Sequence, residues 1–294
     1  MKLGGHCVLY GAEIASNTDA VLSRLAFAGA EGCELGERFF GVEDRQKLTA
    51  ALGRNGIKLA GMHCNNLKLM DLLQNPERSE QALRRVAQFL APLPNRNIIA
   101  TGGPDDPSAP GLGLHGRTLA QGAIPEALHD PQNARIIARN LNDIAGRIKA
   151  EFDVQVNYHN HSWEFADGGL LWFALAEYAP QVRFALDTGW AAVSGFDPVE
   201  LMDRYPGRFH YVHLRDYIRS DNPGDRMFEE VHRGFVDLGT GDMDYPRLMR
   251  KLTQELFEED WAIVEYEIGN FDQNSYLRAI SYLRGARDML RAEV

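Results

Sequence analysis

Short apolar runs and longer amphipathic segments alternate eight times along this chain, and this alternation constrains the fold more than any other feature. The expected helices cover about residues 18–28, 42–54, 79–90, 133–150, 170–178, 198–204, 246–258 and 273–291. The expected strands cover residues 7–10, 33–35, 57–63, 97–100, 152–158, 182–187, 209–214 and 261–265. Strict alternation implies a parallel sheet, and eight units close it into a barrel. The 294 residues show no linker-like break, so we predict one α/β domain, a single (β/α)8 TIM barrel over residues 1–294.

A doubly wound open sheet is the alternative architecture. Such a sheet would be expected to carry a G-x-G-x-x-G turn for a dinucleotide, and no such motif follows an expected strand. After the fourth strand, the chain to about residue 119 is rich in glycine and proline and has no periodicity. We expect this stretch to form a long loop over the strand ends, as lids and binding loops do.

Composition and charge exclude several classes of protein. A formal net charge of −10 disfavours a nucleic-acid partner, which needs a basic footprint. Cys7, Cys33 and Cys64 are an odd number without CxxC spacing, so free thiols in a reducing compartment are expected. No signal peptide is evident, and no apolar run approaches the roughly 20 residues of a membrane span. The sequence therefore predicts a cytoplasmic protein with neither a nucleic-acid nor a membrane partner.

A dense polar cluster follows the fifth expected strand. His159, Asn160, His161 and Glu164 fall within six residues, at the carboxyl end of an alternating run. That end of a barrel strand is where chemistry is assembled. A lone histidine is usually structural, but two with a carboxylate indicate a metal or acid–base site.

The next three strand ends each carry a side chain that can bind a metal. Asp187, His213 and Glu265 end the sixth, seventh and eighth strands. Each alone has a structural explanation, as a cap, a core histidine or an ion-pair partner. Together they predict one divalent ion, either Mn²⁺, Mg²⁺, Co²⁺ or Zn²⁺, because the ligands are oxygen and nitrogen without thiolates. Such an ion would polarise a substrate carbonyl while a neighbouring group removes a proton from the adjacent carbon.

Five motifs in a fixed order carry a resemblance to a known family. They are Tyr-His-Asn-His-x-x-Glu-Phe at 158–165, Leu-Asp-Thr-Gly-Trp-Ala with a later Gly-Phe-Asp-Pro at 186–198, Gly-Arg-x-x-Tyr-Val-His-Leu-Arg-Asp at 207–216, Leu-Gly-Thr-Gly at 238–241 and Ile-Val-Glu at 263–265. The chain resembles the sugar phosphate isomerase/epimerase family, within the xylose isomerase-like TIM-barrel superfamily. The match runs from about residue 151 to the C-terminus, and the first half matches only loosely.

The resemblance implies that Asp187, His213 and Glu265 are metal ligands, with a fourth ligand from the fifth strand. Relatives carry a glutamate where this chain has His159, so either His159 binds the ion or Glu164 reaches back to it. The ligand charge of the family favours Glu164.

The resemblance also implies substrate contacts. Trp190 stands where many relatives have a histidine and would offer an aromatic face to a sugar ring. Arg215 replaces a common lysine and would suit a carboxylate or phosphate group. The other candidate substrate-binding residues are Glu34, His63, His159 and Asn160.

The leading functional hypothesis is a metal-dependent isomerase or epimerase of a small sugar, keto-sugar or sugar phosphate. It would transfer a proton next to a metal-bound carbonyl, with Glu265 and either His161 or Glu164 as the catalytic pair. The alternative is a lyase or dehydratase acting by β-elimination on a 3-keto-glycoside or an inositol-like substrate. An abasic-site endonuclease is disfavoured by the net negative charge of the chain. A sugar-binding barrel without activity is a further alternative, and it would lack the metal ion. Barrels of this kind often form homo-oligomers, but no residue pattern marks an interface.

Overall fold

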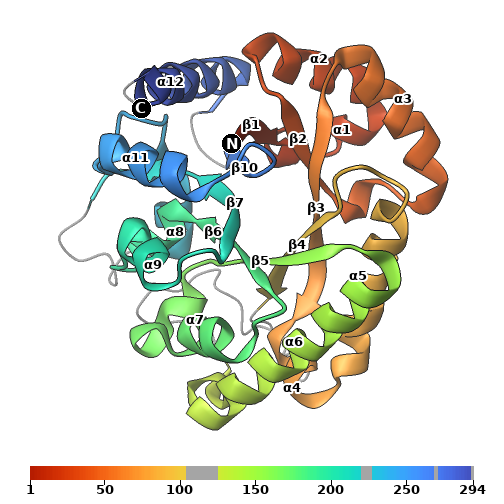
Figure 1. Cartoon of the computed structure of the whole chain (residues 1–294), viewed down its shortest axis with the longest axis vertical. Helices are drawn as coiled ribbons and strands as arrows, with labels where there is room; N and C mark the ends of the chain where they lie inside the picture. The colour runs from red at the N-terminus through yellow and green to blue at the C-terminus, as the bar shows by residue number, and fades with distance from the viewer. Residues whose placement is uncertain (104–124, 220–226, 268–270, 293–294) are drawn as a thin grey trace.

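Eight parallel strands close into a barrel in the computed structural model, with helices around the outside (Figure 1). The structure describes residues 1–103, 125–219, 227–267 and 271–292. The barrel strands are β1 (Lys2–His6), β2 (Gly32–Gly36), β3 (Lys58–Lys68), β4 (Asn97–Gly103), β5 (Gln155–His159), β6 (Arg183–Asp187), β7 (Phe209–Leu214) and β10 (Trp261–Val264). Neighbours in the sequence pair side by side, and β10 closes the ring on β1. The predicted TIM barrel is confirmed; that it is the only domain stays a prediction.

The first strand is the one that the sequence misplaced. Residues 7–10 form a 3-10 helix, η1 (Cys7–Tyr10), and the strand lies just before it. Gly4 and Gly5 weakened the strand signal, but the packing requires them. A Cβ atom on Gly4 would lie 2.8 Å from the backbone oxygen of Gly32 on the neighbouring strand. Such close approach of two backbones is a reason for glycine inside a strand.

The helices of the outer layer follow the predicted alternation. They are α2 (Thr18–Ala28), α3 (Arg45–Asn55), α5 (Pro76–Leu90), α6 (Pro131–Phe152), α7 (Ala166–Tyr178), α9 (Pro198–Arg204), α11 (Tyr245–Glu255) and α12 (Gln273–Ala292). The predicted end of the helix near residue 54 is confirmed, because Gly56 caps α3 with a positive φ of 63°. No helix among the described residues is long and apolar enough to cross a membrane.

Several short elements were not predicted. They are α1 (Glu13–Ser16), α4 (Leu69–Gln74), α8 (Thr188–Val193), α10 (Phe228–Arg233), the 3-10 helices η2 (Glu37–Phe39), η3 (Val42–Asp44), η4 (Glu126–His129) and η5 (Trp163–Phe165), and a hairpin of β8 (Asp216–Tyr217) with β9 (Phe235–Val236). The hairpin and α10 follow β7 and build up the carboxyl rim of the barrel. Most of the long loop predicted after the fourth strand lies outside the described residues.

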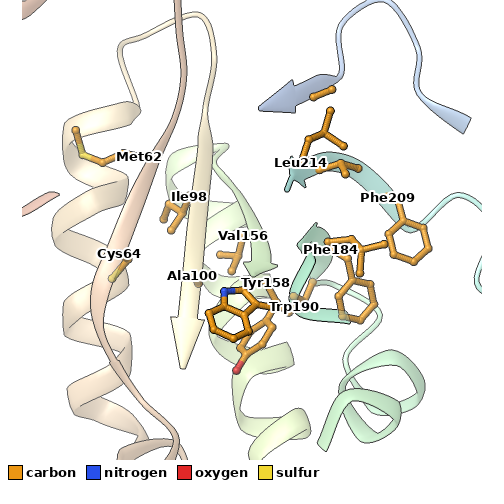
Figure 2. Close-up of a cluster of buried hydrophobic side chains, with 14 of the residues drawn as sticks. Met62, Cys64, Ile98, Ala100, Val156, Tyr158, Phe184, Trp190, Phe209 and Leu214 are labelled. Atoms are coloured by element: carbon orange, nitrogen blue, oxygen red, sulfur yellow. The ribbon is translucent and has the colours of Figure 1, made fainter. Parts of the chain in front are cut away.

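The apolar core has two parts, divided by the barrel wall. The larger part lies between strands and helices, and Figure 2 draws Val156, Phe184, Phe209 and Trp190 within it. The smaller part fills the barrel interior with Ala60, Ile99, Ala185, Tyr211, Trp261 and Ile263. Cys7, Cys33 and Cys64 are buried and form no disulfide. Because side chains alternate along a strand, this division fixes which residues point into the barrel.

Candidate metal centre

Each barrel strand brings one polar side chain to the interior at or near its carboxyl end. Strand neighbours such as Val156 and Tyr158 pack outside the barrel, so the residues beside them face inward. In strand order, the inward residues are His6, Glu34, His63, Thr101, His159, Asp187, His213 and Glu265. All eight are buried. The alternation that defined the strands therefore also assembles a polar ring above the apolar interior.

Four members of this ring form a candidate metal site. His159, Asp187, His213 and Glu265 each offer one ligand atom, and these atoms all lie within 4.8 Å of one another. They come from β5, β6, β7 and the residue after β10. The three ligands that the sequence predicted together are thus brought to one point, with His159 as the fourth.

The hydrogen bonding of the candidate ligand atoms is consistent with a bound cation. Within the described part of the chain, both ring nitrogens of His159 are buried and have no hydrogen-bond partner. Nδ1 of His213 lies 2.6 Å from Oε2 of Glu265, yet neither atom makes an aligned hydrogen bond. Buried polar atoms are rarely left unpaired unless a ligand or ion uses them. Two imidazoles with two carboxylates suit a borderline divalent ion such as Mn²⁺, Co²⁺ or Zn²⁺.

Glu34 sets the tautomer of His213. Nε2 of His213 lies 2.7 Å from Oε2 of Glu34 and donates its hydrogen to it. Burial opposes ionisation of Glu34, but His213 and His6 outweigh it and hold the pKa of the carboxyl well below its usual range. Burial opposes protonation of His213, but Glu34 and Glu265 raise the pKa of His213 well above its usual value, so the ring carries a hydrogen on both nitrogens in the absence of an ion. A metal ion would displace the hydrogen on Nδ1, while Nε2–H stays on Glu34. Glu34 is fully buried and supports the His213 ring; its predicted contact with substrate stays a prediction.

Arg215 neutralises the carboxylates of the site. Its guanidinium is 1% exposed and lies 2.8 Å from Asp187, 3.1 Å from Glu265 and 2.8 Å from Glu267. Burial would raise the pKa of Glu265, but Arg215 and His213 hold it well below its usual range. Burial prevails at Asp187 and raises its pKa to about 6. The geometry does not support Arg215 as a substrate-binding cation, because its donors already bind these three carboxylates.

Glu164 lies apart from the four ligand atoms. Tyr158 donates its hydroxyl hydrogen to Oε1 of Glu164 at 2.7 Å, and the backbone N–H of His161 donates to Oε2 at 2.8 Å. Burial raises the pKa of Glu164 to about 7. The short 3-10 helix η5 turns this carboxyl back onto β5, and His159 takes the fifth-strand position. The preference for Glu164 as ligand therefore has no support in the geometry.

Asn160 and Trp190 have structural surroundings. The Asn160 side chain exchanges two hydrogen bonds with the backbone of Asp187, at 3.0 and 3.2 Å, and so ties β5 to β6. Trp190 is fully buried and stacks on Phe228 at 5.3 Å. Its ring does not line the cavity that opens above the metal ligands, so the predicted contact with a sugar has no support in the geometry. The aromatic wall that sequence reasoning missed is Trp163, although it lies inside the polar cluster that defined the site.

A cavity of about 330 Å³ opens above the metal ligands. It is lined by His6, Cys7, Val8, Gly36, Arg38, Phe39, His63, Asn65, Thr101, Gly103, His159, His161, Trp163, Phe228, His232, Glu265 and Glu267. Its size and its many polar groups suit a small polyhydroxylated molecule. His6 was not predicted because the first strand was misplaced, and His232 was not predicted because α10 had no clear signal.

A second group of three, His6, Glu34 and His63, also places its ligand atoms within 4.8 Å of one another. The backbone N–H of Val8 donates to Nδ1 of His6 at 3.0 Å, so the hydrogen of this ring lies on Nε2. Nε2 then carries the hydrogen and has no lone pair for a metal; it lies 3.1 Å from Oε1 of Glu34 without an aligned hydrogen bond. This tautomer argues against a second metal site, and His63 joins the cavity wall with Thr101 instead, at 2.9 Å.

Comparisons with known proteins agree with the barrel fold. A sequence model of the family described as xylose isomerase-like TIM barrel matches residues 22–286. An inosose dehydratase from Geobacillus kaustophilus is 28% identical over 268 residues, which cover 85% of this chain and 80% of the relative. An inosose dehydratase from Clostridium tetani is 25% identical over 264 residues, covering 86% and 83%.

Solved structures share the fold over almost the whole length. A 3-keto-D-glucoside 4-epimerase from E. coli superposes with a TM-score of 0.69 at 15% identity, covering 97% of this chain and 99% of that one. A probable 3-DHS dehydratase from Bacillus anthracis does so with a TM-score of 0.68 at 14% identity, with the same coverage. At these identities the likeness shows the fold alone.

Proposed function

The chain belongs to the xylose isomerase-like TIM barrel family, and from this premise we propose a divalent-metal-dependent enzyme acting on a small sugar-like ketone. The observation that carries the proposal is the buried group of His159, Asp187, His213 and Glu265 below a cavity of about 330 Å³, with both nitrogens of His159 unpaired among the described residues. A divalent ion held by these four residues would supply a Lewis acid that polarises the substrate carbonyl.

His161 is the proposed base that removes the proton from the carbon next to the carbonyl. Its ring lines the cavity and stacks on Trp163 at 4.2 Å with an interplanar angle of 6°. Burial lowers the pKa of His161 to about 3, so the ring is neutral, and a carbonyl polarised by the ion would have to make the adjacent C–H bond acidic enough for so weak a base. Trp163 donates its indole N–H to the Gly102 carbonyl at 2.9 Å, which fixes the stacking surface. Glu265, which also lines the cavity, is the other candidate base.

The dehydratase outcome is favoured over the isomerase outcome that the sequence suggested first. Two inosose dehydratases match this chain over 80% and 83% of their own length. In β-elimination, the electrons of the broken C–H bond form a double bond as a hydroxyl group leaves the neighbouring carbon. This outcome needs one base and one acid near the metal ligands. We propose an inosose or a similar keto-sugar as substrate.

An epimerase is the second candidate, because imidazoles lie on more than one wall of the cavity. His63 projects from β3 and His161 follows β5. Epimerisation requires a second group that returns the proton to the opposite face of the carbon. Nε2 of His63, next to the Thr101 hydroxyl, could do this.

Metal analysis of the purified protein tests the binding site. We expect one divalent ion per chain, lost in H159Q and retained in E164Q. Loss in E164Q with retention in H159Q would contradict the proposed ligand set. A wild-type protein that binds no divalent ion would favour a sugar-binding barrel without activity.

Incubation of the metal-loaded enzyme with an inosose in heavy water tests the reaction. An unsaturated ketone indicates dehydration, whereas an epimer that carries deuterium indicates epimerisation. If the enzyme neither forms a product nor exchanges a proton with this substrate or with a 3-keto-sugar, the proposed proton abstraction is wrong.

A further inference from the structure

The cavity wall contains a carboxylate–imidazole pair that the steps above do not use. His232 lies on α10, and its Nε2 is 2.5 Å from Oε2 of Glu267. Both side chains line the cavity, and the His232 side chain is 15% exposed. Both side chains therefore belong to the wall that a small molecule bound in this cavity would face.

The surroundings of the pair hold it in one orientation. Arg215 lies 2.8 Å from the same carboxylate oxygen of Glu267, so Glu267 is an ionised acceptor and Nε2 of His232 donates to it. The His232 ring packs against Trp190 and Phe228, with ring centroids 5.5 and 5.6 Å away. Because Nε2 is bound to the carboxylate of Glu267, Nδ1 is the ring nitrogen left to give or take a proton. This also explains the buried Trp190, which supports His232.

His232 and the proposed base approach the cavity from different walls. His161 follows β5, whereas α10 follows β7, and Glu267 follows β10. In the closed barrel, β5 and β10 are three positions apart, in the order β5, β6, β7, β10. Elimination requires two proton transfers at neighbouring carbons, one taken from carbon and one given to oxygen. Two separate imidazoles above one set of metal ligands match this requirement.

We propose that His232 is the general acid of the elimination and that Glu267 is its positioning residue. The proposal rests on the proposed function. As His161 takes the proton from the carbon next to the carbonyl, the C–H electrons form the C=C bond. The C–O bond at the neighbouring carbon breaks, its electron pair stays on oxygen, and Nδ1–H of protonated His232 supplies the proton that completes a water molecule. Substrate loses H and OH in total, and no oxidant or reductant is required.

The test separates proton abstraction from departure of the hydroxyl. The probe is an inosose in heavy water with the metal-loaded enzyme, followed by NMR for deuterium at carbon and by ultraviolet absorbance for the unsaturated ketone. In H232Q the amide can still donate to Glu267, but it has no acidic proton to give. We expect dehydration to fall about 10²- to 10⁴-fold, as for loss of a general acid, while deuterium exchange stays within a few-fold of wild type. H232N serves as a second variant if H232Q folds poorly, and E267Q should shift the same ratio in the same direction.

A matched control and an altered leaving group complete the experiment. His210 pairs with Asp260 at 3.0 Å near the amino end of β7, so H210Q removes a carboxylate–imidazole pair outside the cavity and should change neither rate. A substrate analogue with fluorine in place of the departing hydroxyl needs no proton, so H232Q should release fluoride at nearly the wild-type rate. The role of His232 is overturned if H232Q and H232N lose exchange and dehydration equally, or if they lose neither. It is also overturned if H232Q is as slow with the fluoro analogue as with the hydroxyl substrate. Absence of both exchange and dehydration in the wild type would instead overturn the proposed function on which it rests.

Discussion

Replacement of Arg215 by methionine should destabilise the protein strongly. Arg215 is 1% exposed and is the shared cation of Asp187, Glu265 and Glu267, at 2.8 to 3.1 Å. Methionine fills part of the same space but leaves two buried carboxylates, Asp187 and Glu265, and the partly exposed Glu267 without this cation. Breaking one buried pair costs about 3–5 kcal/mol, because the remaining charge is desolvated and unpaired. We therefore expect R215M to lose at least about 4 kcal/mol of unfolding free energy.

The assay is unfolding by urea and by heat in the presence of a chelator. A loss of this size lowers the melting temperature by roughly 10 °C in a chain of this length. Addition of Mn²⁺ should recover part of the loss, since a divalent ion at His159, Asp187, His213 and Glu265 would supply positive charge to the same carboxylates.

The control is an exposed arginine in a similar pair. Arg54 lies 2.7 Å from Asp19, with side chains 58% and 54% exposed, and R54M should leave the melting temperature unchanged within error. If R215M costs less than about 1 kcal/mol, or no more than R54M, the reasoning that the site depends on Arg215 for charge balance is refuted.

Three further predictions concern other parts of the site and barrel. E34Q should weaken binding of Mn²⁺ about 10- to 100-fold by titration calorimetry, because Glu34 orients the His213 ring; unchanged affinity would contradict this. The pKa of Glu164 is raised by burial to about 7, so the folded state holds a proton that the unfolded chain loses near 4.5. The stability of wild type relative to E164Q should therefore fall by about 3 kcal/mol as pH rises from 4 to 9, measured by urea unfolding with chelator, and parallel pH curves would refute this. G32A should cost about 1–3 kcal/mol by the same assay, because its Cβ would lie 2.5 Å from the Trp261 ring and 2.9 Å from the Lys58 carbonyl; a neutral result would mean that the strands move apart easily.

The barrel and most of its polar ring could be predicted from the sequence. Alternation of apolar and polar residues with a period of two is a local property, so it indicates both where a strand lies and which residues share a face. That was enough to place Asp187, His213 and Glu265 at the same rim. The alternation did not indicate β1, because Gly4 and Gly5 weaken the strand pattern. The need for glycine at Gly4 is evident only from its close contact with the backbone of the neighbouring strand. The loss of β1 also hid His6.

The assignment of roles within the site depended on the tertiary structure. His159 and Glu164 are five residues apart, and either side chain could bind a divalent ion. The 3-10 helix η5 turns Glu164 onto Tyr158 and leaves His159 beside Asp187, His213 and Glu265. Arg215 looked available to substrate until three carboxylates, two of them some fifty residues later in the chain, were seen to bind it. Local pattern thus determined the barrel and the kind of atoms at its rim. Long-range packing decided which atoms are already paired, because burial makes each polar group find a partner wherever the fold supplies one.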